Sequence, residues 1–292
     1  MRLLLSLAFL LCAVSAPAQP AIPATPAVPG QARPALPVAP SAVTPPPMPS
    51  TPDVPAAAPS VSVIADSSLK LVLAALAQAW ADTQDNGPLV PLTLTNAGTL
   101  RSKVESGPSM YDVVISADVA DAKALTDKGL LFADGQRSLA RNTVVMYGRK
   151  ALLKEDDLDW FELIGNEWKK VALGSPDLTA SGRVAVHALQ RHDLLGDDQK
   201  GLYVYAPTEA LAIAQVQRGT ADAVFIFKTD AARLNTPGCE IVPIKSDDAP
   251  PVFYIASISR LAKNPTQARA FLDYCSGADA KAIWAKFGFE TN

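Results

Sequence analysis

Small hydroxyl residues and glycine are grouped in three short turns, each of which follows an apolar run. The turns are Asp66-Ser67-Ser68, Asn96-Ala97-Gly98-Thr99 and Thr179-Ala180-Ser181-Gly182. Each is expected to begin a helix, whose first amides have no partners within the helix and carry a partial positive charge. Several helix starts that meet in one cleft would hold an anion without a charged side chain. For any turn taken alone, ordinary helix capping explains the same residues.

Other kinds of chemistry have little support in the sequence. His187 and His192 lie five residues apart with no cysteine beside them, so no metal site is expected. We find no nucleophile with a placed base and no glycine-rich phosphate loop with a lysine, so neither catalysis nor a cofactor is expected. The net charge is −3 and basic residues do not cluster, which argues against nucleic-acid binding.

The elements that position the turns are short β-branched runs alternating with helical patterns. This alternation favours an α/β fold with a mainly parallel sheet. Such sheets bind ligands at the carboxyl ends of their strands, which is where the three turns fall. Strands are expected at 61–64, 92–95, 113–115, 144–147, 171–173, 223–227 and 252–258, and helices near 100, at about 183–192, 209–218 and 265–274.

The first residues are typical of a cleavable signal peptide, expected over residues 1–18. Arg2 precedes an apolar run too short for a comfortable membrane span, and small residues follow it. Residues 19–59 are almost entirely Ala, Pro, Val, Ser and Thr, so a disordered linker is expected there. Export to the periplasm would permit a disulfide, and the sequence leaves open whether Cys239 and Cys275 pair.

Several stretches resemble the periplasmic molybdate-binding proteins of ABC importers. Residues 63–69 look like that family's first strand and loop, and residues 98–118 are similar to its signature almost position by position. The resemblance covers roughly residues 61–290. Further matches are Arg141-Asn142, Gly174-Ser175-Pro176, Ser181-Gly182, Gly219-Thr220-Ala221-Asp222-Ala223 and Phe287-Gly288-Phe289.

The resemblance implies a two-lobed type II periplasmic-binding-protein fold that closes on a dehydrated tetrahedral oxyanion. Residues 60–142 plus 252–292 would form lobe 1, and residues 143–251 lobe 2. It also implies a periplasmic protein, expected to be a monomer, that captures molybdate or tungstate. The implied partner is an ABC transporter permease, and no catalysis is implied.

Carried over residue by residue, the ligand contacts fall on Ser68, Ala97, Ser181, Glu209 and Phe227, with Ser67, Gly98 and Thr99 as further candidates. The family usually has serine at the position of Ala97 and often tyrosine at that of Phe227, so two hydroxyl donors are missing. A carboxylate inside an anion site is repulsive, so either Glu209 faces solvent or the ligand is not a free dianion.

These departures favour an alternative in the same class, a binding protein for a different oxyanion or a small organic acid. A tethered envelope protein and an enzyme are the remaining alternatives.

Overall fold

Two β-sheets form the framework of the computed structural model, which describes residues 60–84, 87–150 and 159–291. All of these residues belong to a single compact unit. The expected signal peptide (1–18) and linker (19–59) lie outside the described residues.

The first sheet, which with its helices we call lobe 1, has the strand order β2-β1-β3-β10-β4. Strand β1 pairs in parallel with β2 and β3, and β10 pairs antiparallel with β3 and β4. Four of the five strands therefore run in the same direction. Their bounds are β1 (Val63–Asp66), β2 (Leu92–Thr95), β3 (Val113–Ser116), β4 (Arg137–Asn142) and β10 (Val252–Ile258).

The second sheet, in lobe 2, repeats this scheme in the order β7-β6-β8-β5-β9. Strand β6 is parallel to both neighbours, and β5 is antiparallel to both of its own. The two sheets therefore have the same arrangement of strand directions. The strands are β5 (Val144–Arg149), β6 (Val171–Gly174), β7 (Tyr203–Ala206), β8 (Ala223–Phe227) and β9 (Cys239–Val242).

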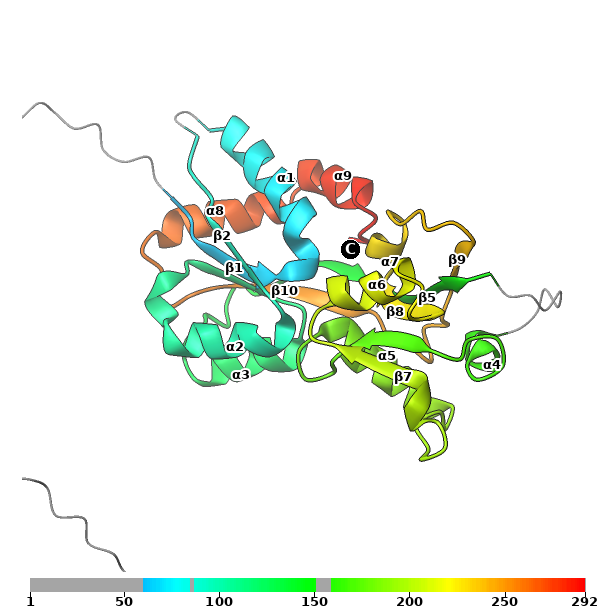
Figure 1. The fold of residues 1–292 in the computed structure, drawn as a ribbon. Coiled ribbons are helices and arrows are strands. Elements are labelled where there is room, and N and C mark those ends of the chain that lie inside the picture. The colour runs from blue at the N-terminus through cyan, green and yellow to red at the C-terminus, as the bar shows by residue number, and fades with distance from the viewer. Residues whose placement is uncertain (1–59, 85–86, 151–158, 292) are drawn as a thin grey trace, which may run out of the picture. The chain divides into compact units, whose positions relative to one another are not determined.

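Helices cover both faces of each sheet, as Figure 1 shows for α1, α8 and α9 on one side of lobe 1 and α2 and α3 on the other. The helices are α1 (Lys70–Asp82), α2 (Ala97–Ser106), α3 (Val119–Asp127), α4 (Trp160–Leu163), α5 (Ala180–Arg191), α6 (Glu209–Gln217), α7 (Lys228–Ala231), α8 (Pro265–Ser276) and α9 (Ala278–Lys286), and the short 3-10 turns are η1 (Ser67–Leu69), η2 (Pro108–Met110) and η3 (Lys200–Leu202).

Alternate residues of the central strands pack into different hydrophobic clusters. In β1, Val63 and Ala65 join the cluster that contains Trp80 of α1, whereas Ile64 joins the one that contains Leu100 of α2. The side chains of a strand point alternately to its two faces, and helices on both faces bury all of them. This explains why the central strands read as continuous apolar runs, with all four residues of β1 buried.

All the expected strands are present with ends shifted by at most two residues, but β4, β7 and β9 were not expected. All three lie at the edge of a sheet. Edge strands pair on one side only and tolerate polar and exposed residues, as in β4 and β9, whereas β7 has no charged residue but is only four residues long. Helix α5 begins at Ala180, three residues before its expected start, because Thr179 already caps it.

None of the helices in the described ranges is long and apolar enough to cross a membrane. Cys239 lies in β9 of lobe 2 and Cys275 in α8 of lobe 1, and the structure has both as free thiols.

Candidate functional site

Four strand-to-helix turns meet around one small cavity, two from each lobe. The turns connect β1 to η1, β2 to α2, β6 to α5 and β7 to α6, and each contributes two consecutive residues to the lining. The space measures about 10 Å³, which holds about one water molecule. The lining consists of Asp66, Ser67, Asn96, Ala97, Thr179, Ala180, Thr208 and Glu209.

A larger hollow of about 490 Å³ lies beside α1 and β2, lined mostly by apolar residues of lobe 1. It takes in no residue of lobe 2 and no turn at the carboxyl end of a strand. The small cavity between the lobes is therefore the better candidate site, because four polar turns converge there.

The first residue of each pair caps the helix that follows. The Asp66 carboxylate accepts from the Ser68 amide at 3.0 Å, and the Asn96 side chain accepts from the Thr99 amide at 3.0 Å. Thr179 and Thr208 cap α5 and α6 in the same way, through the Gly182 and Leu211 amides. Capping thus accounts for these four side chains, while the residues that follow them begin the helices at the cavity wall.

The hydroxyls of Ser68 and Thr99 are bonded within lobe 1. The Ser68 Oγ lies 2.6 Å from the Asp66 carboxylate and 2.9 Å from the Tyr254 phenol oxygen. The Thr99 hydroxyl donates to Asn96 Oδ1 at 2.6 Å. Neither residue lines the cavity, whereas Ser67 does.

Glu209 faces the cavity and not the solvent, so the solvent-facing option for this residue is wrong. The fully buried Ser181 donates its hydroxyl to Glu209 Oε1 at 2.5 Å, and the Ser181 backbone amide acts on the same carboxyl. The carboxyl is buried although part of the residue's surface stays exposed. Burial, together with the charges of Asp66 and Asp230, raises the pKa of Glu209 to about 8.

Burial also raises the pKa values of the other acidic groups around Glu209. Burial raises the pKa of Asp66, although hydrogen bonds from Ser68 oppose the shift. Burial likewise raises the pKa of Asp230, and it raises that of the Tyr254 phenol well above its ordinary value. The site therefore gathers acidic groups, and none of the residues that line the cavity is a lysine or arginine.

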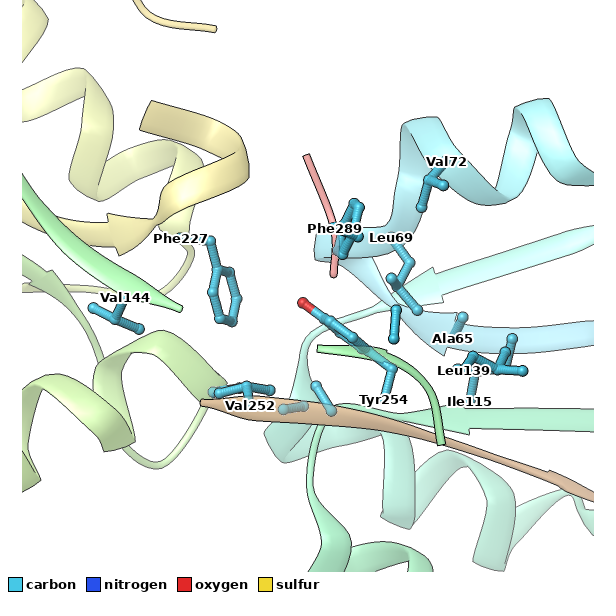
Figure 2. Packing of buried hydrophobic residues seen from close by; sticks show 14 of the residues in the cluster. Ala65, Leu69, Val72, Ile115, Leu139, Val144, Phe227, Val252, Tyr254 and Phe289 are labelled. Atoms are coloured by element: carbon cyan, nitrogen blue, oxygen red, sulfur yellow. The ribbon is translucent and has the colours of Figure 1, made fainter. Parts of the chain in front are cut away.

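Ala97 and Phe227, where the family's hydroxyl donors are missing, lie in different surroundings. Ala97 is the first residue of α2 and lines the cavity. Phe227 is fully buried at the end of β8, in the same hydrophobic cluster as Tyr254, and does not line it. Figure 2 shows the Tyr254 hydroxyl directed from β10 toward the side on which Phe227 lies.

Gly98 brings the two lobes into contact beside the cavity. Its amide donates to the carbonyl of Leu178 in lobe 2 at 2.9 Å, so this amide is not directed at a ligand. A Cβ at Gly98 would lie 2.0 Å from the Asp177 carbonyl oxygen, which makes glycine necessary for this contact.

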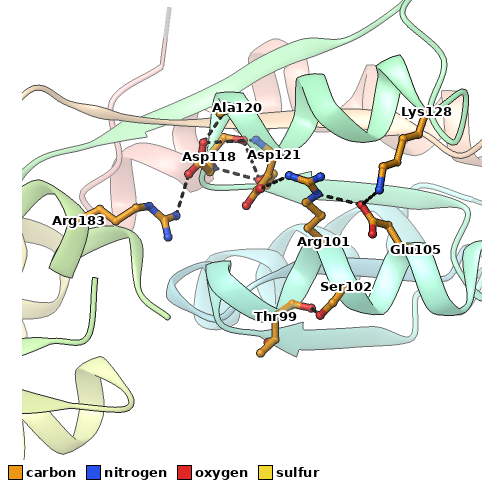
Figure 3. Close-up of polar contacts among 10 residues, drawn as sticks. Thr99, Arg101, Ser102, Glu105, Asp118, Ala120, Asp121, Lys128 and Arg183 are labelled. Atoms are coloured by element: carbon orange, nitrogen blue, oxygen red, sulfur yellow. Dashed lines mark hydrogen bonds and ion pairs between the residues drawn. The ribbon is translucent and has the colours of Figure 1, made fainter. Parts of the chain in front are cut away.

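A second contact between the lobes is the ion pair between Arg183 of α5 and Asp118 at the start of α3, at 3.0 Å (Figure 3). Arg101 and Lys128 in Figure 3 instead form ion pairs within lobe 1, both with Glu105.

Sequence reasoning missed three features of the site. The turn from β7 to α6, which contributes Thr208 to the lining, was not among the turns singled out. Tyr254 was expected only as part of a strand, and its contact with Ser68 joins residues far apart in the chain. The pairing of Ser181 with Glu209 links two different helices, which no local pattern shows. Within the described residues, no group of three His, Cys, Asp or Glu side chains could hold a metal ion.

The chain is similar in sequence or in structure to several solute-binding proteins. The molybdate-binding protein ModA of Escherichia coli (strain K12) is 26% identical over 237 residues, covering 78% of this chain and 88% of that protein. YvgL of Bacillus subtilis (strain 168), named as an ABC transporter substrate-binding lipoprotein, is 27% identical over 195 residues, covering 66% and 72%. The periplasmic molybdate-binding protein of Azotobacter vinelandii superposes with a TM-score of 0.68 at 22% identity, covering 80% and 99%.

These likenesses confirm the two-lobed type II periplasmic-binding-protein fold and the resemblance to molybdate-binding proteins. They agree with two equivalent sheets whose strand ends face one cavity. A family described as bacterial extracellular solute-binding proteins matches residues 61–290. The chain belongs to this family of solute-binding proteins, which serve ABC transporters.

Proposed function

We propose that this protein captures a small tetrahedral oxyanion outside the cytoplasm and delivers it to the permease of an ABC importer, with molybdate or tungstate as the first candidates. The observation that carries the proposal is the meeting of four helix-starting turns around one cavity between the lobes. Helix starts bind anions through their amides and dipoles, without a charged side chain. The molybdate-binding relatives support the same ligand class.

The proposed contacts come from both lobes. Ser67 and the backbone at Ala97, which line the cavity, would hold the anion from lobe 1. Ser181 does not line the cavity but follows the lining residue Ala180, and its amide and hydroxyl would hold the anion from lobe 2. In the described conformation the Ser181 hydroxyl is bonded to Glu209, and the cavity holds about one water molecule. Binding therefore requires that the lobes open or that the Glu209 side chain turns aside. Periplasmic location and a monomeric state belong to the proposal.

A different oxyanion or a small organic acid is the second candidate ligand. The Glu209 carboxyl and the absence of hydroxyls at Ala97 and Phe227 favour it. A lost hydrogen bond to a charged ligand costs about 1.5–3 kcal/mol, so a site built for molybdate would bind it more weakly without these donors.

Calorimetry of the purified chain with molybdate, tungstate, sulfate, phosphate and a panel of small carboxylic acids tests the two candidates. Tight binding of molybdate and tungstate with phosphate excluded supports the first. Binding of another oxyanion or of a carboxylic acid in their place supports the second. If none of these compounds binds, oxyanion capture is wrong.

A further inference from the structure

Glu209 is placed to act on whatever occupies the cavity. It is the first residue of α6, and its carboxyl meets the first turn of α5 through Ser181. The Ser181 hydroxyl and amide both act on this carboxyl, and they are the donors that the proposed function assigns to the anion. In the described conformation Glu209 therefore takes the place of an external anion at this helix start.

Among the residues that the structure describes, no lysine, arginine or histidine forms an ion pair with the Glu209 carboxyl. Asp66 at the end of β1 and Asp230 of α7 act on it as negative charges, and the Tyr254 phenol of β10 lies within its electrostatic reach. Arg183 acts on Asp66, and Arg233 forms an ion pair with Asp230. An ionised Glu209 would thus be buried among like charges, which favours its neutral form.

The charge state of Glu209 decides whether it helps or opposes an anion. An ionised carboxylate beside a dianion is repulsive and offers only acceptors. A protonated carboxyl has one O–H donor, and buried carboxylic acids kept neutral by their surroundings serve as donors to oxyanions in other proteins. Such a donor would replace one of the two hydroxyls that Ala97 and Phe227 lack.

We propose that Glu209 binds the oxyanion as a neutral carboxylic acid, giving up the donors of Ser181 to the guest and donating its own O–H to a guest oxygen. The inference rests on the proposed oxyanion-binding function, and it adds that the binding of the anion is coupled to the protonation of Glu209. When Glu209 is ionised beforehand, each captured dianion is taken up together with one proton from the solvent. The site therefore binds the dianion tightly only when Glu209 carries a proton.

The proposal is supported by the raised pKa of Glu209, about 8, whose first cause is burial. Below that pH the carboxyl already carries the proton, and above it binding must include proton uptake. The affinity for molybdate, which carries no proton of its own near neutral pH, should then fall by up to about tenfold for each pH unit above the Glu209 pKa.

The test is calorimetry of the full chain with molybdate and with tungstate, between about pH 6 and about pH 9, in buffers of different ionisation enthalpy. Three proteins are compared, the wild type, Glu209→Gln and the control Glu240→Gln, which changes an exposed glutamate of β9. Glutamine has nearly the shape of glutamic acid and keeps a neutral donor at every pH.

In the wild type and in Glu240→Gln we expect weaker binding as the pH rises, with proton uptake approaching about one per anion at the alkaline end. Glu209→Gln should bind with a flat pH profile, without proton uptake, and with the affinity that the wild type has at acidic pH. A flat profile without proton uptake in the wild type overturns the role of Glu209 and leaves oxyanion capture standing. If neither the wild type nor Glu209→Gln binds either anion at any pH, the capture of molybdate and tungstate is overturned, and the role of Glu209 toward them falls with it.

Discussion

Lobe 1 and lobe 2 have the same strand order and directions, yet their turns present different groups to the cavity. In lobe 1 the carboxylate of Asp66 is occupied by the amide and hydroxyl of Ser68 within its own turn. In lobe 2 the carboxyl of Glu209 reaches out of its own turn to Ser181 on a neighbouring helix. The shared topology thus fixes where the four turns meet, whereas single residues at the helix starts decide the charge there.

The first residues of the helices make the contrast sharper. Helix α2 of lobe 1 begins with Ala97, and α6 of lobe 2 begins with Glu209. An acidic residue in the first turn of a helix is commonly stabilising because it faces the positive end of the dipole. Glu209 departs from that ordinary role because its carboxyl is buried at the cavity between the lobes.

The largest effect is expected from Gly98→Ala, which breaks the contact between the lobes. The new Cβ would lie 2.0 Å from the Asp177 carbonyl oxygen, so the lobes cannot close as described. We expect oxyanion affinity to fall by at least about a thousandfold, or about 4 kcal/mol, in calorimetry. Gly201→Ala is the control, because a Cβ there meets nothing within 4 Å. Equal affinities for the two variants would show that this contact does not support binding.

The next effect is the pH dependence that Glu209 of lobe 2 gives to the free energy of unfolding of the ligand-free protein. Because the folded-state pKa of Glu209 is raised to about 8, its contribution to stability is fully present below the unfolded-state pKa and is lost as the pH rises toward 8. The free energy of unfolding should fall by up to about 1.4 kcal/mol per pH unit over that window. Urea denaturation should show a smaller loss in Glu209→Gln, although Asp66 and Asp230 still contribute. An unchanged pH dependence in this variant would contradict the burial of an acid at this position.

A smaller effect separates the two adjacent serines of lobe 1. Ser67→Ala should weaken oxyanion binding by about 1.5–3 kcal/mol if its hydroxyl donates to the charged guest. Ser68→Ala should instead lower the free energy of unfolding by about 1 kcal/mol, because Asp66 and Tyr254 lose a partner. Calorimetry and denaturation of both variants measure the two effects. The reverse pattern, with Ser68→Ala affecting binding, would place the family's serine contact at Ser68 after all.

The smallest effect is expected at the ion pair between the lobes. Arg183 and Asp118 are 3.0 Å apart and partly exposed, and such pairs contribute about 0.2–1 kcal/mol. A double-mutant cycle with Arg183→Gln and Asp118→Asn should give a coupling energy of this size for ligand affinity, decreasing in high salt. A coupling energy that does not depend on salt would argue against an electrostatic contribution to closure.

The sequence predicts the central strands and three of the four turns for reasons that the structure makes clear. Strands such as β1 are buried on both faces, so their apolar runs stand out. The edge strand β7 is only four residues long and has buried residues only at its two ends, and the turn that follows it was not among the three singled out. Glu209 was identified only through the family resemblance.

What the sequence does not show is which side chains meet across elements. The direction of Glu209 depends on where the sheet of lobe 2 places the first turns of α5 and α6, and the partner of Ser68 comes from β10, 186 positions away. Such contacts depend on how whole helices and strands pack, which local residue patterns do not determine. The charge of the site follows from these contacts, so it too could be known only from the structure.

The placement of β10 has a consequence for the order in which the lobes can fold. All five strands of lobe 2 lie between Val144 and Val242, so its sheet is complete as soon as that uninterrupted segment has emerged. Lobe 1 lacks β10, which joins β3 to β4, until the last part of the chain arrives. Because Val252 pairs with Asn142, the whole of lobe 2 is an insertion whose two ends are neighbours. During synthesis from the N-terminus, the lobe that begins first is therefore the one that finishes last.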